Sequence, residues 1–287
     1  MGGGGKSFHP YDLAKGGVLQ CAEAITFGMP FEVWKTYMGA NRHEGTLQAF
    51  QSVYKNGGVK AFWRGWEAKM VESFLKGGVL LFAKEGIIRS TQSFGLGELT
   101  SGLVGGFGGG VTQVVVIAPC SYIVSAAVVG AKEGEKMTTM ERVMMTYRQN
   151  GIGGFYKGSV PLMARQGSNW ASRQGITDYV RTSIRKWKSS SSGGAEQSLS
   201  VGEEAVAGVI GGCLSTWNQP FEVMRIDAQA RAARGEASQG MVKTAGVIMK
   251  ESGPMGFFVG VIPRMGLCVA QTLFMVTLPY ILKNYGL

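Results

Sequence analysis

Apolar and charged segments alternate along the whole chain. Six segments are candidates for membrane-spanning helices: 16–31, 66–89, 99–131, 161–185, 205–221 and 265–282. The third and the sixth are long uncharged runs, the fifth nearly reaches the required length, and the first is apolar apart from Glu23. Two of them, 66–89 and 161–185, carry charged side chains among apolar ones. About 20 apolar residues suffice for a helix to cross a membrane, and charged residues lie within a membrane when they face a polar interior. The pattern therefore predicts a bundle of six helices around a polar cavity.

Two short motifs recur at intervals of about a third of the chain. Pro30, Pro119 and Pro220 are 89 and 101 residues apart, and the turn glycines Gly65, Gly158 and Gly260 are 93 and 102 residues apart. Because both motifs share one period, the sequence predicts three repeats, with boundaries at 1–95, 96–190 and 191–287. Each repeat also contains a short helical pattern between its proline and its glycine, at 44–55, 138–149 and 240–250.

The composition narrows the class of protein. A net charge of +10 suits nucleic acid, an acidic membrane surface or an anionic solute, but the chain has long apolar runs and 45 % hydrophobic residues. We find no zinc-ligand or RNA-recognition pattern, so nucleic acid is not an expected partner. The four cysteines show no metal-ligand spacing. No nucleophile–base pair or phosphate loop is visible, and we expect no enzymatic activity, metal or cofactor.

The proline motifs and glycine turns together resemble the mitochondrial carrier family along nearly the entire chain. Its signature, P-x-(D/E)-x-x-(K/R), is present as Pro30, Glu32 and Lys35 and again as Pro220, Glu222 and Arg225. The middle copy keeps Pro119 but has Ser121 and Val124 at the charged positions. The resemblance implies an all-α, multi-pass protein of the mitochondrial inner membrane. It would have six transmembrane helices in three pseudo-symmetric repeats around a central cavity, with short matrix-side helices.

The resemblance also implies two gates. In the family, acids and bases of the proline motifs pair between repeats and close the matrix side, which assigns Pro30, Glu32, Lys35, Pro119, Pro220, Glu222 and Arg225 to a matrix gate. Because the middle copy lacks both charges, only repeats 1 and 3 can form a bridge, either Glu32–Arg225 or Lys35–Glu222. We expect the remaining motif charges to face water or backbone carbonyls.

The cytoplasmic gate of the family corresponds here to one acid–base pair, Asp178 with Arg181. The same positions in the other repeats hold Glu85 with Ile88, and Tyr280 with Lys283, so neither repeat has the pair. We therefore expect a weak outer gate.

A candidate substrate face follows from counting along each helix from its turn glycine. Positions separated by three or four residues share a helical face, and the resemblance places substrate contacts on it. The predicted binding residues are Glu72, Lys76, Arg165, Gln166, Asn169, Arg173 and Gln271. Arginine and lysine exceed acid in this set, which favours anions. Lys69 is interpreted as a partner of Glu72, and Arg264 as either structural or substrate-binding.

Several local sequences, including RQGSNWASRQGI and STWNQPFEVMR, resemble the citrate–oxoglutarate branch of the family. The sequence thus predicts a carrier that exchanges di- or tricarboxylate anions by alternating access. The family resemblance also suggests cardiolipin as a lipid partner. An alternative is a carrier-fold protein that serves as a structural subunit of a respiratory-chain membrane complex, because both gates have lost charges and transport needs two states of comparable stability.

Overall fold

The fold of the chain is helical throughout the described residues, which in this computed structural model are 10–95, 97–132, 137–191, 199–236 and 239–284. Six long segments form the body: α1–η1–α2 (Pro10–Glu23, Ala24–Gly28, Met29–Ala40), α4 (Trp66–Ser93), α5–α6 (Glu98–Thr112, Val114–Lys132), α8 (Ser159–Ser191), α9–η4–α10 (Val201–Leu214, Ser215–Asn218, Gln219–Ala233) and α12 (Val261–Asn284). Three short helices lie between them: α3 (Thr46–Lys55), α7 (Thr139–Asn150) and α11 (Met241–Ser252).

The same order of elements occurs three times. Each repeat has a broken long segment, a short helix, a 3₁₀ turn (η2, Val59–Trp63; η3, Ile152–Tyr156; η5, Pro254–Phe258) and an unbroken long helix. The three short helices predicted from the sequence are confirmed within two residues at either end. The six predicted long segments are also present, although the first extends to Ala40 because its charged motif is helical too.

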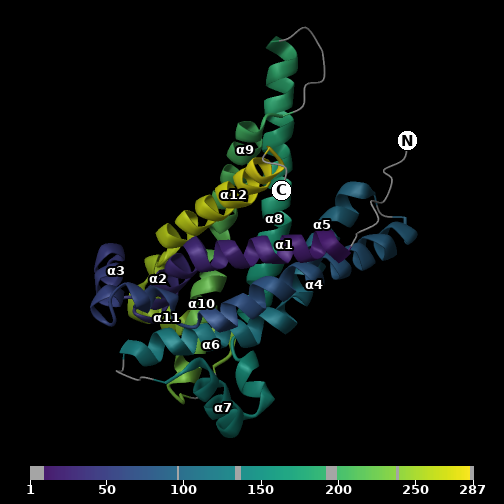
Figure 1. The fold of residues 1–287 in the computed structure, drawn as a ribbon. Coiled ribbons are helices and arrows are strands. Elements are labelled where there is room, and N and C mark those ends of the chain that lie inside the picture. Colours follow the sequence, from purple (N-terminus) through teal and green to yellow (C-terminus); the bar gives the residue numbers. More distant parts are fainter. Residues whose placement is uncertain (1–9, 96, 133–136, 192–198, 237–238, 285–287) are drawn as a thin grey trace.

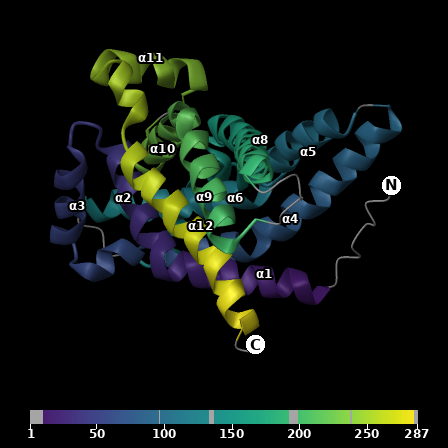
Figure 2. The same cartoon turned by 90° about the horizontal axis from the view of Figure 1, so that it is seen from above.

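The six long segments form a closed ring. Each packs against the next in chain order, and α12 returns to pack on α1 and α2. In Figure 1 the short helices α3, α7 and α11 lie toward one end of this ring, and the far parts of α4, α5 and α8 diverge at the other. Figure 2, seen from above, shows α12 crossing beside α9 and α1. We refer to the two ends as the short-helix end and the open end.

Each broken segment leaves regular α geometry five or six residues before its proline. The π-helical turn η1 begins at Ala24, Gln113 separates α5 from α6, and α9 ends at Leu214. In repeats 1 and 3 the irregular turn runs almost to the proline. In repeat 2 the two helices meet at 47°, and Pro119 lies inside α6. The helix therefore breaks before the proline in all three repeats, and the proline ring is not the only cause of the break.

Aromatic residues two positions before the turn glycines support the proline region in two repeats. Proline has no N–H, so it leaves the carbonyl four residues earlier without its helical partner. For Pro119 that carbonyl belongs to Val115, and the Tyr156 hydroxyl donates to it at 3.0 Å. In repeat 1 the Trp63 indole N–H donates to the Ile25 carbonyl at 2.5 Å. The corresponding Phe258 of repeat 3 has no side-chain donor.

The three turn glycines lock neighbouring repeats together in a cycle. All three have positive φ, between 77° and 81°, a conformation that glycine adopts without a steric penalty. A Cβ at Gly65 would lie 3.1 Å from Val124 Cα, one at Gly158 3.2 Å from the Arg225 carbonyl oxygen, and one at Gly260 3.4 Å from the Lys35 carbonyl oxygen. Each turn therefore packs on the base position of the next motif, which makes Lys35, Val124 and Arg225 structurally equivalent.

Length and apolarity alone single out few membrane helices. Among the described residues, one helical stretch, 254–276, is long and apolar enough to cross a membrane, and α5–α6 passes the same criterion if the bent pair is taken as one span. The other long helices carry charged residues. The ring geometry tells us where those charges lie.

Candidate solute-binding cavity

A cavity of about 420 Å³ occupies the centre of the ring. All seven residues predicted to bind substrate line it, namely Glu72, Lys76, Arg165, Gln166, Asn169, Arg173 and Gln271. They come from α4, α8 and α12, one long helix of each repeat. The face counted from the glycine turns is thus the face of these three helices that lines the cavity. Whether these side chains bind a solute stays a prediction.

The charge of the cavity differs from the sequence-based expectation of one acid among several bases. Its lining contains six basic side chains, Lys69, Lys76, Arg165, Arg173, Arg181 and Arg225, and four acidic ones, Glu23, Glu32, Glu72 and Glu204. The excess is therefore two positive charges. Such a lining attracts anions, but with a smaller surplus than the substrate face alone indicated.

The basic groups are not equally available to a ligand. Lys69 pairs with Glu72 at 2.8 Å, as expected, so this acid is already neutralised. Arg173 donates to the hydroxyl of Thr272 at 3.0 Å. The Arg165 Nε lies 3.2 Å from Glu222 but without hydrogen-bond geometry. Among the described side chains, no hydrogen bond or ion pair engages the Lys76 ammonium group, so a bound anion would meet no competing partner there.

Arg264 has a structural position. Its guanidinium is buried and donates to Gln219 at 2.9 Å, to Asn218, and to Asn169 at 3.3 Å. Since the Asn169 oxygen already accepts this bond, its amide nitrogen and one lone pair of the oxygen are left for a solute. Of the two interpretations of Arg264, the structure favours the structural one.

At the short-helix end, a buried ion-pair network closes the cavity. Lys35 from repeat 1 and Glu222 from repeat 3 are 2.7 Å apart, whereas Glu32 and Arg225 are 3.9 Å apart. The side chains of Lys35 and Glu222 are 2 % and 0 % exposed. The direction of pairing that the sequence left open is therefore set: the base of repeat 1 binds the acid of repeat 3.

The expectation that the other motif charges face water was wrong. Glu32 contacts Lys35 at 3.0 Å and Lys69 at 3.8 Å. Arg225 donates two hydrogen bonds of 2.9 Å each to the Glu222 carboxylate. The error has a physical cause: burial without partners would cost several kcal/mol per charge, so each side chain turns to the nearest opposite charge, including one on its own helix.

A neutral link replaces the missing bridge between repeats 2 and 3. Gln229 lies one turn after Arg225 and accepts a hydrogen bond from it at 2.7 Å. The Gln229 amide nitrogen donates to the Ser121 hydroxyl at 3.0 Å, and its oxygen accepts from Ser125 at 2.8 Å. Ser121 stands at the acid position of the middle motif. The substituted residue is thus still connected to Arg225, through an amide instead of a direct ion pair.

The two predicted residues of the cytoplasmic gate lie at the open end. Asp178 and Arg181 pair at 3.1 Å on one face of α8, and Arg181 also pairs with Glu204 of α9 at 2.7 Å. In the described part of the chain, no ion pair joins either residue to α4 or α12. The side chains of Glu85, Tyr280 and Lys283 fall outside the described ones. The lining of the cavity includes Arg181 and Glu204, so the cavity extends to this end.

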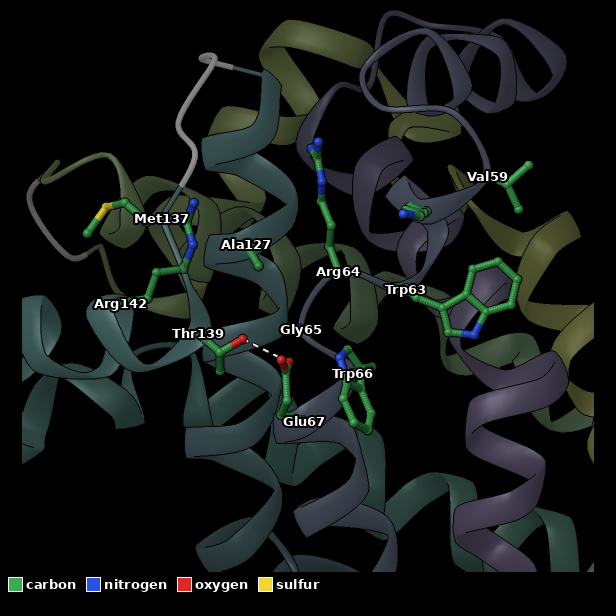
Figure 3. A pocket seen from close by; sticks show the side chains of 11 residues that line it. Val59, Trp63, Arg64, Gly65, Trp66, Glu67, Ala127, Met137, Thr139 and Arg142 are labelled. Carbon is green, nitrogen blue, oxygen red and sulfur yellow. Dashed lines mark hydrogen bonds between the residues drawn. The ribbon is translucent and has the colours of Figure 1, made fainter.

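A second cavity of about 540 Å³ lies at the short-helix end, between repeats 1 and 2. Its lining combines Lys60, Arg64 and Arg142 with Trp63 and Trp66. Figure 3 shows Arg64, Arg142 and the two tryptophans in this cavity, together with the hydrogen bond from Thr139 to Glu67, whose length is 2.9 Å. Burial and the neighbouring Arg142 lower the pKa of Arg64.

Three repeats in a closed ring, with a charged cavity open at one end and closed by ion pairs at the other, are the architecture of a solute carrier. Comparison of the sequence with family models agrees: the mitochondrial carrier protein model matches residues 6–94, 97–187 and 197–286. The chain belongs to the mitochondrial carrier family. The repeat boundaries predicted above stay a prediction.

Curated relatives of this chain include carriers of organic acids. It is 33 % identical to the citrate/oxoglutarate carrier protein of Saccharomyces cerevisiae, over 92 % of this chain and 86 % of the relative. Identity to mitochondrial tricarboxylate transport protein B of Danio rerio is 26 %, over 92 % and 84 %. For the mitochondrial tricarboxylate transport protein of Rattus norvegicus it is 25 %, over 92 % and 86 %.

Sequence reasoning missed one wall of the cavity. Gln20 and Glu23 line it from α1, a segment for which only helix formation was predicted. The signal was present, because Glu23 is the only charged residue between 16 and 31. An isolated acid in an apolar span is itself a sign of function. In addition, no group of three or more His, Cys, Asp or Glu side chains suited to a metal ion occurs among the described residues.

Proposed function

We propose that this protein exchanges di- and tricarboxylate anions across the mitochondrial inner membrane by alternating access. The observation that carries the proposal is the cavity with an excess of two positive charges. Among the described side chains, none pairs with the Lys76 ammonium group in this cavity. The citrate/oxoglutarate and tricarboxylate names of the relatives support the same class of solute.

The six ring segments are proposed to cross the membrane. Charged side chains of α4 and α8 line the internal cavity, so they need not contact lipid. By family resemblance, the short-helix end faces the matrix and the open end faces the cytoplasm.

Binding and gating follow from the positions of the charges. An anion entering from the open end passes Arg181 and Glu204 and then meets Arg173 and Lys76. Arg165, which lies beside Glu222, is next. A carboxylate bound to Arg165 weakens the attraction between Arg165 and Glu222. Glu222 also holds Lys35, so substrate binding reaches the interface between repeats 1 and 3. A ligand shifts a two-state equilibrium only by its differential affinity for the two states, and this shared acid provides the difference.

Purified protein in liposomes tests the proposal through exchange of labelled citrate or oxoglutarate. Lys76→Ala removes the cation that has no partner among the described side chains. We expect a loss of exchange of about tenfold or more, because a hydrogen bond to a charged group contributes about 1.5–3 kcal/mol. Arg165→Ala should abolish exchange. Lys243→Ala is the matched control, since Lys243 is exposed on α11 outside the cavity. Absence of carboxylate exchange by the wild-type protein would contradict the proposal.

The alternative, a structural subunit of a respiratory-chain complex, was motivated by the missing gate charges. Gln229 forms a hydrogen bond to Ser121, which stands where the middle motif lacks its acid, and Lys69 lies 3.8 Å from Glu32. The missing gate charges are therefore a weaker argument for a structural subunit. Migration of the protein in mild detergent separates the two functions. A carrier migrates alone, whereas a structural subunit co-purifies stoichiometrically with a larger complex and shows no exchange.

An anionic lipid, cardiolipin by family resemblance, is the proposed occupant of the cavity in Figure 3. Two arginines and a lysine suit phosphate, and the tryptophans suit the membrane interface. Burial and, to a lesser extent, the neighbouring Arg142 lower the pKa of Arg64, and a bound anion would offset both effects. Retention of lipid phosphate on purification, lost in Arg64→Ala, is the corresponding measurement.

A further inference from the structure

The wall of the cavity formed by α1 carries oxygen atoms that lack donors. Glu23 is only 4 % exposed, yet its Oε1 has no hydrogen-bond partner within the described chain. One helical turn earlier, the buried Oε1 of Gln20 also has none. A buried acceptor without a donor costs about 1–3 kcal/mol. Two such atoms lining the same cavity indicate that a proton or a donor group completes the wall.

The backbone fixes the position of this carboxyl group. Glu23 is the last residue of α1 and precedes the π-helical turn η1, a type of distortion frequent at functional sites. Gly28 makes room for the side chain, because a Cβ there would lie 3.2 Å from Glu23 Oε1. The Glu23 carbonyl accepts a hydrogen bond from Thr26 at 3.2 Å. Local helix geometry, and not a salt bridge, therefore holds the acid at the cavity.

The charged groups facing Glu23 come from three elements: Lys69 and Lys76 of α4, Glu32 of α2, and Arg173 of α8. From α12, the lining contributes the neutral Gln271 and Thr272. Lys69 is already paired with Glu72 and Glu32. No ion pair within 4.0 Å joins any of the described cations to Glu23. The carboxyl group can therefore gain or lose a proton without breaking an ion pair of its own.

We propose that Glu23 is a proton-binding site that accompanies the more highly charged substrate. With Glu23 ionised, the lining has six positive and four negative side chains, an excess that matches a dicarboxylate. Protonation of Glu23 raises the excess by one and matches a tricarboxylate. The step is balanced: one proton from water at the open end joins the carboxylate, its hydroxyl donates to the bound anion, and both leave on the opposite side.

The inference rests on the proposed function and is tested with citrate as trianion and oxoglutarate as dianion. In liposomes, wild-type exchange of external citrate for internal oxoglutarate should carry about one proton inward per citrate, read with an internal pH dye. Exchange should not respond to an imposed membrane potential. In Glu23→Gln, proton movement is lost, the ratio of citrate to oxoglutarate exchange no longer depends on pH, and the mixed exchange becomes sensitive to potential.

Glu23→Asp is the matched variant and should restore proton movement at least in part. Calorimetry in two buffers of different ionisation enthalpy measures proton uptake without transport: about one proton per citrate bound by the wild-type protein and none by Glu23→Gln. Citrate exchange without proton uptake in the wild-type protein, or uptake that persists in Glu23→Gln, overturns the inference while leaving the proposed function intact. Absence of any carboxylate exchange or binding instead refutes the proposed function.

Discussion

Two interfaces at the short-helix end differ in chemistry although the backbone builds them alike. Between repeats 1 and 3, Lys35 and Glu222 form a buried ion pair at 2.7 Å. Between repeats 2 and 3, the middle motif has no charge, and Gln229 reaches Ser121 and Ser125 through neutral hydrogen bonds. Arg165 of α8 adds a charged contact of 3.2 Å to Glu222, without hydrogen-bond geometry. Hydrogen bonds between neutral groups are weaker than charge-assisted ones. The comparison indicates that the closed end is held mainly at one of its interfaces.

The second layer of ion pairs strengthens the same interface. Arg42, at the end of the first repeat's motif helix, pairs with Asp227 of α10 and with Glu251 of α11. Arg231 adds a bond to Asp227 at 2.8 Å. Repeats 1 and 3 are thus joined by two sets of ion pairs, one at Lys35 and Glu222 and one at Arg42. Of the ion pairs between described side chains at this end, fewer join repeat 2 to its neighbours than join repeats 1 and 3. We therefore expect repeat 2 to separate first when the carrier changes state.

Removing Glu222 should have the largest effect, because it is the acid shared by Lys35, Arg165 and Arg225. Glu222→Gln keeps the shape but leaves buried cations without a counter-charge, which costs about 3–5 kcal/mol. We expect a markedly lower midpoint of thermal unfolding in detergent. Glu236→Gln is the control, since Glu236 is exposed and its pairs with Arg231 and Arg234 are worth about 0–1 kcal/mol. Equal shifts for the two variants would refute the assignment of the ion pair as the main closure.

Replacing Gln229 tests the neutral interface and should cost less. Gln229→Ala leaves one nitrogen of Arg225 and the hydroxyls of Ser121 and Ser125 without their partner. We expect about 1–3 kcal/mol of destabilisation, measured by the same unfolding assay. Gln149→Ala, an exposed change on α7, is the control. If Gln229→Ala were as damaging as Glu222→Gln, the two interfaces would contribute equally and the asymmetry would be refuted.

The sequence predicted the helical architecture well because its signals are local or periodic. Six long segments, three short helices and the face carrying Lys76 and Arg165 all follow from residue spacing along one helix. The choice of Lys35–Glu222 over Glu32–Arg225 did not follow, since it depends on distances between repeats. Counting interface partners also overlooked that buried charges pair within their own helix.

The sequence prediction missed the position of Glu23 in the cavity wall for a different reason. The predicted substrate face was counted from the turn glycines, and these precede only α4, α8 and α12. A residue on α1 could not enter that count. The break at Gln113, ahead of Pro119, was likewise outside the motif that drew attention to the proline. In both cases the information lay on the broken segments, where helix geometry departs from the regular pattern.

A smaller effect is expected from the hydrogen bond that supports the bend of repeat 2. Tyr156→Phe removes the donor to the Val115 carbonyl, which Pro119 has deprived of its helical N–H. The expected loss is about 0.5–1.5 kcal/mol, again from thermal unfolding. Tyr147→Phe is the control, because Tyr147 is exposed on α7. A loss of equal size in both variants would mean that the hydroxyl does not support the bend.

The smallest effect concerns the start of α7, the short helix of repeat 2. Thr138 and Glu141 form a capping box, in which the Glu141 carboxylate accepts from the Thr138 backbone N–H at 2.6 Å. The hydrogen bonds from Thr138 lower the pKa of Glu141. The ionised form is therefore preferred in the folded state. Its contribution is present above the unfolded pKa, near about 4.3, and is lost as the pH falls through the lower folded value.

The unfolding midpoints of the wild-type protein and of Glu141→Gln, compared over a range of pH, test this dependence. Glutamine keeps a hydrogen-bond acceptor at the capping position but does not titrate. We expect the difference in unfolding midpoint between the two proteins to shrink on acidification, because only the wild-type loses its charged acceptor. Repeat 1 provides the internal reference, since α3 begins after Gly45 with no side-chain cap. A difference that stays constant down to acidic pH would show that the Glu141 charge does not stabilise α7, and that the short helices of repeats 1 and 2 are held by packing alone.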